Sequence, residues 1–314
     1  MDKVLIVGGA GYVGGYMTNV LLSNSYDVTV YDNLMYEKRY LKAVKFIYGD
    51  VRDKKKLLSI LCDYDIVIWL AAIVGDGACD IDPFLTMSIN EDVVIWLVNN
   101  YSGKIVFMST ASVYGFSDNI LFEDATPNPL SLYAVTKLNA ERYIIENSKN
   151  YTIFRLGTLF GVGDEFSRIR LDLVANKLSY KSCLKEKVIL YGLEQWRPLL
   201  HVKDVGLAVL YALDNNLQGL FNLGYKNYTI SQIFEEVKNL IPGCSLEHKD
   251  IPDEDLRNYR LDFTKYHDHG WKPFYNLSDG IKEIRDIIFQ NRIKDPDNSI
   301  YYNEGYLNEN YYKL

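Results

Sequence analysis

The sequence predicts an α/β protein in which a doubly wound, mainly parallel sheet is followed by a smaller, discontinuous C-terminal domain. Apolar strands alternate with helical segments from the first strand to Gly161, and a glycine-rich turn joins that strand to the first helix. Beyond Gly161 an irregular, Lys-rich segment replaces the alternation. These three observations set the fold class and divide the chain into two parts.

The glycine-rich turn is the segment around which the chain is organised. Residues 4–7 are aliphatic, and Gly8-x-x-Gly11-x-x-Gly14 follows at once. Glycines at these places allow a tight turn and a close backbone approach to a pyrophosphate at a helix N-terminus. A second apolar strand ends at Asp32, near the ~20-residue offset at which a carboxylate binds the adenosine ribose. The turn therefore predicts a Rossmann domain that binds a dinucleotide.

The apolar periodicity places the other elements. Nearly uninterrupted apolar runs such as residues 65–72 are typical of parallel strands covered on both faces. The expected strands are residues 4–7, 28–31, 45–48, 65–72, 104–108, 152–156, 188–191 and 220–223, and the expected helices are residues 16–23, 91–100, 132–147 and 169–176. We expect a cofactor-binding domain over residues 1–163, to which residues 200–224 return, and a mainly substrate-binding domain over residues 164–314.

Composition excludes several classes of protein. The net charge of −7 argues against a partner that is a nucleic acid, because such domains usually carry a basic face. The four cysteines lie far apart without a C-x-x-C spacing, and the four histidines lack a partner set, so neither a disulfide framework nor a metal site is expected. The first strand begins at residue 4 and the apolar run 66–74 is too short to span a bilayer, so a cytoplasmic location without a membrane partner is expected.

Tyr133 and Lys137 are the candidates for catalysis. They lie four residues apart at the start of an expected helix, so the phenol and the ammonium share one face. An isolated pair of this kind usually has no function, but here a nucleotide-type turn and the polar loop at Thr110 precede it. A cation ~4 Å from a phenolate contributes ~4 kcal/mol at an effective dielectric of ~20, or ~3 pKa units. Lys137 is therefore expected to bring the pKa of Tyr133 from ~10 to near 7, so that Tyr133 accepts a hydroxyl proton while hydride leaves for the cofactor.

Together these features resemble the extended short-chain dehydrogenase/reductases of the NAD-dependent epimerase/dehydratase family, which act on nucleotide-linked sugars. The resemblance covers most of the chain. It is carried by Gly8-x-x-Gly11-x-x-Gly14, Asp32-Asn33, Asp50-Val51, Leu70-Ala71-Ala72, Ser109-Thr110-Ala111-Ser112-Val113-Tyr114-Gly115, Tyr133-x-x-x-Lys137, His201-Val202-Lys203-Asp204-Val205, Phe221-Asn222-Leu223-Gly224 and Gly270-Trp271-Lys272-Pro273.

The resemblance implies a set of site residues. The catalytic residues it implies are Thr110, Tyr133 and Lys137. The cofactor it implies is NAD, bound by Gly8, Gly11, Tyr12, Val13, Gly14, Asp32, Asn33, Asp50, Val51, Leu70, Ala71, Ala72 and Lys137. A carboxylate at Asp32 without an adjacent arginine favours NAD over NADP, whose 2′-phosphate would face a like charge. The substrate it implies is a nucleotide-linked sugar, contacted by Val74, Gly75, Thr110, Ser112, Arg197 and Arg260.

The loop after Thr110 reduces the number of candidate reactions. Relatives that eliminate water carry Asp-Glu after the catalytic Thr, whereas this chain has Ala111 and Ser112. The Cys of fucose-synthase-type enzymes and the Glu of related decarboxylases are missing too. Oxidation or reduction at C4 of the sugar remains. A further departure is Thr158, where many relatives have an Asn that contacts the substrate phosphate.

Within the family, the loop over residues 73–80 and the segment over residues 253–260 look most similar to a GDP-manno-heptose C4 dehydrogenase of surface-polysaccharide pathways. We therefore expect net NAD-dependent oxidation at C4 of a nucleotide-linked hexose or heptose. A 4-epimerase is the near alternative because it uses the same residues, and a 4-keto-sugar reductase is another. From a different class, a non-catalytic NAD-sensing regulator would tend to lose Tyr133 and Lys137, which this chain keeps.

Two further expectations concern assembly and the tail. The resemblance implies a homodimer or larger assembly that packs through the helix carrying Tyr133 and its neighbour. Apolar positions that could serve that face, or equally the core, are Val93, Val94, Leu97 and Leu138. The Tyr- and Asn-rich tail from Pro296 is expected to wrap a surface or to fray.

Overall fold

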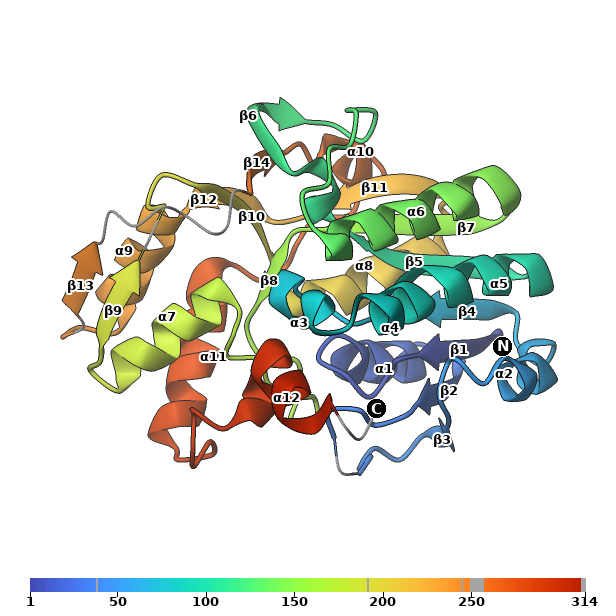
Figure 1. Ribbon diagram of the computed structural model, residues 1–314, viewed down its shortest axis with the longest axis horizontal. Helices are drawn as coiled ribbons and strands as arrows, with labels where there is room; N and C mark the ends of the chain where they lie inside the picture. Colours follow the sequence, from blue (N-terminus) through green and yellow to red (C-terminus); the bar gives the residue numbers. More distant parts are fainter. Residues whose placement is uncertain (38, 191, 244, 249–256, 312–314) are drawn as a thin grey trace.

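The computed structural model describes residues 1–37, 39–190, 192–243, 245–248 and 257–311, and its centre is a seven-stranded sheet (Figure 1). All neighbouring strands of this sheet pair in parallel. Across the sheet they are β11 (Gly219–Leu223), β7 (Tyr151–Leu156), β5 (Lys104–Thr110), β4 (Ile66–Trp69), β1 (Lys3–Val7), β2 (Asp27–Asp32) and β3 (Lys45–Tyr48). The strand order reverses between β1 and β4, as in a doubly wound α/β fold, so the predicted fold class is confirmed.

Helices cover both faces of the sheet and bury its central strands. Every residue of β4 and β5 is buried, which explains their unbroken apolar sequences. Packed against one face are α2 (Lys54–Leu61), α5 (Val93–Asn100) and α6 (Leu132–Asn147). Packed against the other are α1 (Gly14–Ser23), α8 (Val202–Asp214) and α10 (Thr264–Asp268).

A second lobe lies beside the carboxyl ends of the strands (Figure 1). Its core is built from α7, α9, α11 and the small strands beside them. The helices of this lobe are α7 (Val174–Cys183), α9 (Ile230–Leu240) and α11 (Leu277–Phe289). Its strands are β8 (Thr158–Phe160), β10 (Trp196–His201) and β12 (Lys226–Thr229) in one sheet, and β9 (Lys187–Leu190) and β13 (Ser245–His248) in another. A third strand pair joins β6 (Phe116–Leu121) to β14 (Asn258–Leu261).

Two expected elements are wrong. The helix expected over residues 169–176 begins only at Val174, because the Leu171 amide donates to the Tyr301 carbonyl of the tail instead of to a helical carbonyl. The loop expected over residues 73–80 instead forms α3 (Asp76–Ile81), followed by α4 (Pro83–Met87) and a π-helical turn (Ser88–Asp92). Asp82 caps α4 by accepting from the Leu85 amide, so the segment has its own helix start.

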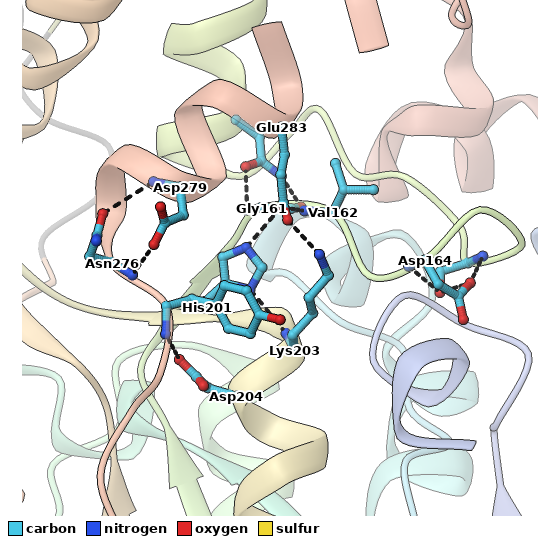
Figure 2. A network of polar contacts seen from close by, with 12 residues as sticks. Gly161, Val162, Asp164, His201, Lys203, Asp204, Asn276, Asp279 and Glu283 are labelled. Atoms are coloured by element: carbon cyan, nitrogen blue, oxygen red, sulfur yellow. Dashed lines mark hydrogen bonds and ion pairs between the residues drawn. The ribbon is translucent and has the colours of Figure 1, made fainter. Parts of the chain in front are cut away.

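Figure 2 shows the polar joint that fixes the second lobe to the sheet. Glu283 on α11 accepts from the Val162 amide at 2.8 Å, and its other oxygen pairs with Lys203. His201 Nε2 lies 2.8 Å from the Glu283 carboxylate, and the ring is fully buried. Asp204 at the start of α8 accepts from two backbone amides just before α11. The joint between the lobes is thus held by partly buried, charge-assisted hydrogen bonds.

The tail from Pro296 folds back onto its own chain. A 3₁₀ turn (Ser299–Tyr301) leads into α12 (Asn303–Asn310), which packs on α3 (Figure 1). Leu307 is buried in the same core cluster as Ala78 and Cys79 of α3. We call residues 299–310 the C-terminal cover.

Other expectations concern the surface. The structure places the four apolar positions considered for a subunit face in the core of the chain itself, at 3% exposure or less: Val93, Val94, Leu97 and Leu138. Cys62, Cys79 and Cys183 are free thiols, and Cys244 lies outside the described residues. In the described ranges, no helix combines the length and apolarity needed to cross a membrane.

Candidate active site

A cavity of about 1780 Å³ lies between the carboxyl ends of the central strands and the second lobe. It is lined by the glycine turn after β1, the loops after β2 and β4, the end of β5 and the start of α6, and residues of α7 and β9. Single small-molecule sites occupy roughly 300–1,000 Å³. The cavity therefore has room for two large ligands side by side.

The glycine turn is shaped by contacts that no side chain would permit. Gly8 has φ +82°, and a Cβ on it would lie 2.4 Å from the Ala71 amide nitrogen. A Cβ on Gly14 would lie 2.3 Å from the Gly9 carbonyl oxygen, so α1 starts directly against the turn. The turn and the helix N-terminus together form a site for a phosphate anion. Gly8, Gly11, Tyr12 and Val13 line the cavity, and Gly14 lies behind them.

Asp32 at the end of β2 is held by backbone amides. Its carboxylate accepts from the Ala10 amide at 3.0 Å and from the Leu34 amide at 2.7 Å. Burial raises the pKa of this carboxyl group, and the backbone hydrogen bonds oppose that rise. Asn33 lines the cavity beside it and donates to Asp50, which itself lies outside the lining and pairs with Arg52.

The rest of the predicted cofactor site follows β3 and β4. Val51 comes after β3, and Leu70, Ala71 and Ala72 come directly after β4; all four line the cavity. The Leu70 and Ala71 amides both donate to the Val7 carbonyl, which binds this loop to the end of β1. Small side chains at Ala71 and Ala72 leave the sheet edge open.

The three candidate catalytic residues converge from two elements. Thr110 ends β5, and Tyr133 and Lys137 lie one turn apart on α6, whose start is capped by Ser131 accepting from the Ala134 amide. All three line the cavity. The Thr110 hydroxyl accepts from the Ser112 amide at 3.1 Å, and its side chain acts on Tyr133 in the direction of a lower pKa. A hydroxyl of a ligand placed here would meet both Thr110 and Tyr133.

The expected lowering of the Tyr133 pKa by Lys137 is wrong for this arrangement. Burial raises the pKa of Tyr133 well above its usual value, and the Thr110 side chain only partly offsets the rise. Burial also lowers the pKa of Lys137 to about 7, against the opposing charge of Glu141. Lys137 Nζ lies 4.0 Å from the centroid of the Phe107 ring. Removal from water outweighs the attraction between ammonium and phenolate that the spacing alone suggests.

Behind the candidate catalytic residues lies a buried ionic network that spacing did not indicate. Glu141, one turn beyond Lys137 on α6, accepts from the Ser109 hydroxyl at 2.7 Å. Its carboxylate also pairs with the Arg155 guanidinium, and both side chains are at most 4% exposed. Arg155 donates to the Tyr114 hydroxyl at 2.6 Å. The network ties the loop of Thr110 to the helix of Tyr133.

The predicted substrate residues divide into two groups. Val74, Gly75, Ser112 and Arg197 line the cavity. Arg197 is 7% exposed, and its guanidinium donates to the Arg257 carbonyl at 2.6 Å.

The remaining predicted substrate residue, Arg260, does not line the cavity. It donates to the Asp118 carbonyl and lies over the Trp196 ring instead. Arg257 lines the cavity in its place and pairs with Asp76 of α3 at 3.1 Å. Residues 253–256 of the segment singled out above lie outside the described residues. Thr158 also lines the cavity.

A charged segment that sequence reasoning missed also faces the cavity. Arg168, Arg170 and Asp172 all line it, and Arg170 and Asp172 form a bidentate pair at 2.9 and 2.8 Å. Their alternation with Ile169 and Leu171 has a period of two, which is typical of an extended segment with one polar face. That alternation was the signal available in the sequence.

The residues present fit a bound dinucleotide. The Tyr36 hydroxyl is buried without a hydrogen-bond partner in the described chain, and Tyr36 lines the cavity. Buried polar atoms of this kind call for a ligand. The cradle at Gly8 and the amide-held Asp32 suit a pyrophosphate and a ribose, respectively. Within the described ranges, no group of three or more His, Cys, Asp or Glu side chains is arranged to hold a metal ion.

Known proteins are similar to this chain in sequence and in architecture. The model of the NAD dependent epimerase/dehydratase family matches residues 4–224. A putative UDP-glucose 4-epimerase from Methanocaldococcus jannaschii is 30% identical over 305 residues, covering 90% of this chain and 96% of its own length. A UDP-glucose 4-epimerase from Corynebacterium glutamicum is 27% identical over 259 residues, covering 74% of this chain and 78% of its own length.

Solved structures agree with these relatives. The UDP-glucuronic acid 4-epimerase from Bacillus cereus, in complex with UDP-glucuronic acid and NAD, has a TM-score of 0.78 at 26% identity, with 92% of this chain and 99% of that chain covered. The Thermus thermophilus UDP-glucose 4-epimerase in complex with NAD also has a TM-score of 0.78 at 26% identity, with coverages of 90% and 98%. The chain therefore belongs to the NAD-dependent epimerase/dehydratase family, and its cofactor is NAD.

Proposed function

We propose that this protein is an NAD-dependent 4-epimerase of a UDP-linked sugar. The observation that carries the proposal is the meeting of Thr110, Tyr133 and Lys137 in one cavity that has room for a dinucleotide and a nucleotide-linked sugar. The relatives and the two solved structures described above are named as 4-epimerases of UDP-linked sugars, one of them as a putative enzyme. This support favours epimerisation over the net C4 oxidation that we first expected.

The chemistry assigned to this chain's own residues is proton transfer at the C4 hydroxyl. When bound, oxidised NAD supplies a positively charged ring that takes the C4 hydride and can give it back. Tyr133 accepts the hydroxyl proton and later returns it, and Thr110 holds the same oxygen by a hydrogen bond. Tyr133 must lose its own proton first; burial opposes this loss by raising the pKa of the phenol, and the charge of Arg170 favours it.

Epimerisation differs from oxidation only in what happens after the hydride has left. In an epimerase the 4-keto sugar turns over in the cavity and receives the hydride on its other face. The wide cavity between the two lobes supports such a rotation. A dehydrogenase of a GDP-linked heptose uses the same residues and releases the ketone. The UDP-sugar names of the relatives make this second proposal weaker than the first.

The test uses purified protein with NAD and four candidate substrates: UDP-glucose, UDP-glucuronic acid, UDP-N-acetylglucosamine and a GDP-linked hexose. NMR of the products and absorbance of reduced cofactor are followed together. A 4-epimer formed without net reduced cofactor is the expected result with one of the UDP-sugars. A ketone that accumulates with an equal amount of reduced cofactor would instead establish the dehydrogenase. Tyr133→Phe is the catalytic control, and a non-catalytic regulator would turn over none of the four.

We also propose that two copies pair through α5 and α6. Val135 and Ile145 of α6 are each 38% exposed, although both are apolar. Sedimentation of the wild-type protein and of Val135→Asp at the same concentrations tests this pairing. A dimer that Val135→Asp dissociates is expected, and a wild-type monomer would refute the proposal.

A further inference from the structure

Arg168 places a buried cation in the wall of the cavity. The residue is 6% exposed and lines the cavity, and burial together with the neighbouring Arg170 lowers its pKa to about 10. Arg170 has Asp172 as a bidentate partner. In the described part of the chain, no carboxylate lies within ion-pair distance of Arg168; the charges of Asp172 and Glu37 act on it only from farther away. A buried charge without a counterion is costly, so this position calls for an anion.

The guanidinium is held in place by neutral groups. Its Nε and Nη2 donate to the Ile300 carbonyl at 3.2 and 2.9 Å, and its Nη1 donates to the Asn303 side-chain oxygen at 2.5 Å. These contacts use three of the five N–H groups of an arginine. The Tyr36 ring covers one face of the guanidinium, 4.0 Å from ring centroid to Cζ. Two donors remain for a ligand in the cavity.

The neighbourhood of Arg168 is the phosphate end of the cofactor site. The Ser167 side chain packs against the first turn of α1, since a Cβ on Gly15 would be 1.9 Å from the Ser167 hydroxyl oxygen. Asp164 pairs with Lys42 and accepts from Asn19 of α1, which fastens the same segment to the helix. The chain therefore carries Arg168 past the helix N-terminus at which a pyrophosphate is expected.

The C-terminal cover closes over this place. Asn303 at the start of α12 accepts from Arg168 and donates to the Val74 carbonyl at 2.7 Å, in the loop after β4. Tyr306 of α12 meets the Tyr36 ring in the loop after β2, with centroids 5.2 Å apart. In the sheet, β1 lies between β2 and β4. The cover thus spans the end of β1, where the glycine turn lies, and residues of α12 line the same cavity.

We propose that Arg168 binds the diphosphate of the bound dinucleotide and that Asn303 fastens the C-terminal cover across it, so that the cofactor stays bound between turnovers. The ligand chemistry is a nucleoside diphosphate. The sugar substrate also carries a diphosphate, but the diphosphate that we assign to Arg168 is that of the cofactor. The proposal concerns binding of the family's cofactor and does not depend on whether the reaction is epimerisation or oxidation.

The first test measures the release of radiolabelled NAD from loaded holoenzyme into excess unlabelled NAD. Loss of a charge-assisted contact in Arg168→Gln is expected to speed release about tenfold or more. The salt dependence of release is expected to fall as well, because the lost contact is ionic. The matched control is Arg292→Gln, which changes an exposed arginine at the end of α11. UDP affinity, measured by calorimetry on the same holoenzymes, is expected to stay within twofold.

Two results would overturn the assignment. If Arg168→Gln weakened UDP binding and left NAD release unchanged, the cation would serve the substrate's diphosphate. If NAD release, its salt dependence and UDP affinity all stayed at wild-type values, Arg168 would be a structural residue only. Arg168→Lys keeps the charge and is expected to release NAD at a rate between the wild-type and the Gln variant, which covers the case in which the Gln variant folds poorly.

Asn303→Ala tests the cover separately from the cation. It removes the link to Arg168 and the link to Val74 while the guanidinium stays, so NAD release is expected to speed up by about threefold to tenfold. The matched control is Asn147→Ala, at the exposed end of α6, where the side chain donates to the Tyr143 carbonyl of its own helix. Unchanged release in Asn303→Ala, with a normal melting temperature, would refute a role of the cover in holding the cofactor.

Discussion

The two ends of the cavity are built in different ways. At the cofactor end, backbone amides and glycines make the surface: Gly8 and Gly14 leave no space for a side chain, and Asp32 is fixed by two amides. At the substrate end, long side chains from loops make the surface. Arg197 and Arg257 reach into the cavity there, and Arg257 pairs across it with Asp76.

This difference indicates which end of the cavity tolerates amino-acid substitution. Backbone surfaces that follow strand ends are fixed by the sheet itself, whereas side chains on loops can be replaced without disturbing the fold. We therefore expect the cofactor end to tolerate almost no substitution and the substrate end to set specificity. Tyr133 and Thr110 lie where the two ends meet.

Tyr133→Phe gives the largest expected effect and separates chemistry from both ends. Turnover is expected to fall about 10³-fold, since a positioned acid–base group contributes 10²–10⁴-fold. NAD and UDP are expected to bind with wild-type affinity because neither end of the cavity is altered. Steady-state kinetics with calorimetry checks this. A variant that keeps more than a tenth of wild-type turnover would mean that another residue carries the proton.

Paired glycine substitutions compare the two ends directly. Gly8→Ala meets the Ala71 backbone at 2.4 Å and is expected to cost about 3 kcal/mol, which corresponds to a melting temperature lower by about 6 °C or more and to lost NAD binding. Gly75 has φ +108° with no atom nearer than 3.9 Å to its Cβ position, so Gly75→Ala carries only backbone strain of about 1–2 kcal/mol. Equal losses of NAD affinity in the two variants would contradict the contrast.

Arg197→Ala and Arg260→Ala test which arginine contacts the substrate. Arg197 lines the cavity and is nearly buried, so its loss is expected to raise KM for the nucleotide sugar about tenfold or more, with little change in NAD affinity. Arg260 lies outside the lining, and Arg260→Ala is expected to change KM less than twofold. If Arg260→Ala had the larger effect, the second lobe would have to close differently around the substrate.

Lys137→Met is expected to give the smallest change in melting temperature, with a characteristic pH dependence of stability. The folded pKa of Lys137, about 7, lies below its unfolded value of 10.5, so the unfolded chain binds more protons between these values. The burial cost is fully present below pH 7 and is relieved as the pH rises toward 10.5. Lys137→Met is therefore expected to melt at least about 2 °C above the wild type at pH 6, with a smaller difference at pH 9. A difference that grows with pH would show that the sign of this pKa shift is wrong.

The sequence alone was sufficient wherever one local pattern decides the structure. The glycine turn, the sheet and the bounds of the helix over residues 132–147 could all be predicted, because strand ends and capped helices have local signals. The meeting of Thr110 with Tyr133 followed from the resemblance, since β5 and α6 are brought together only by the sheet.

What could not be predicted depends on packing between distant segments. The pKa of Tyr133 is decided by how much water its surroundings exclude, and spacing along a helix carries no information on that. Arg168 and Asn303 are 135 residues apart and acquire a role only when the tail folds back. The helix over Asp76–Ile81 was missed because Gly75 just before it and Gly77 within it favour a loop when α12, which packs on it, is left out of account.

In the proposed epimerisation, the hydride leaves C4 of the sugar and returns to the same sugar molecule. The most direct measurement is the fate of deuterium placed at C4 of the UDP-sugar that the protein turns over, followed by NMR and mass spectrometry of sugar and cofactor. The account predicts a 4-epimer that keeps its deuterium at C4, with no labelled reduced cofactor in solution. Ketone in solution together with deuterated, released cofactor would contradict it.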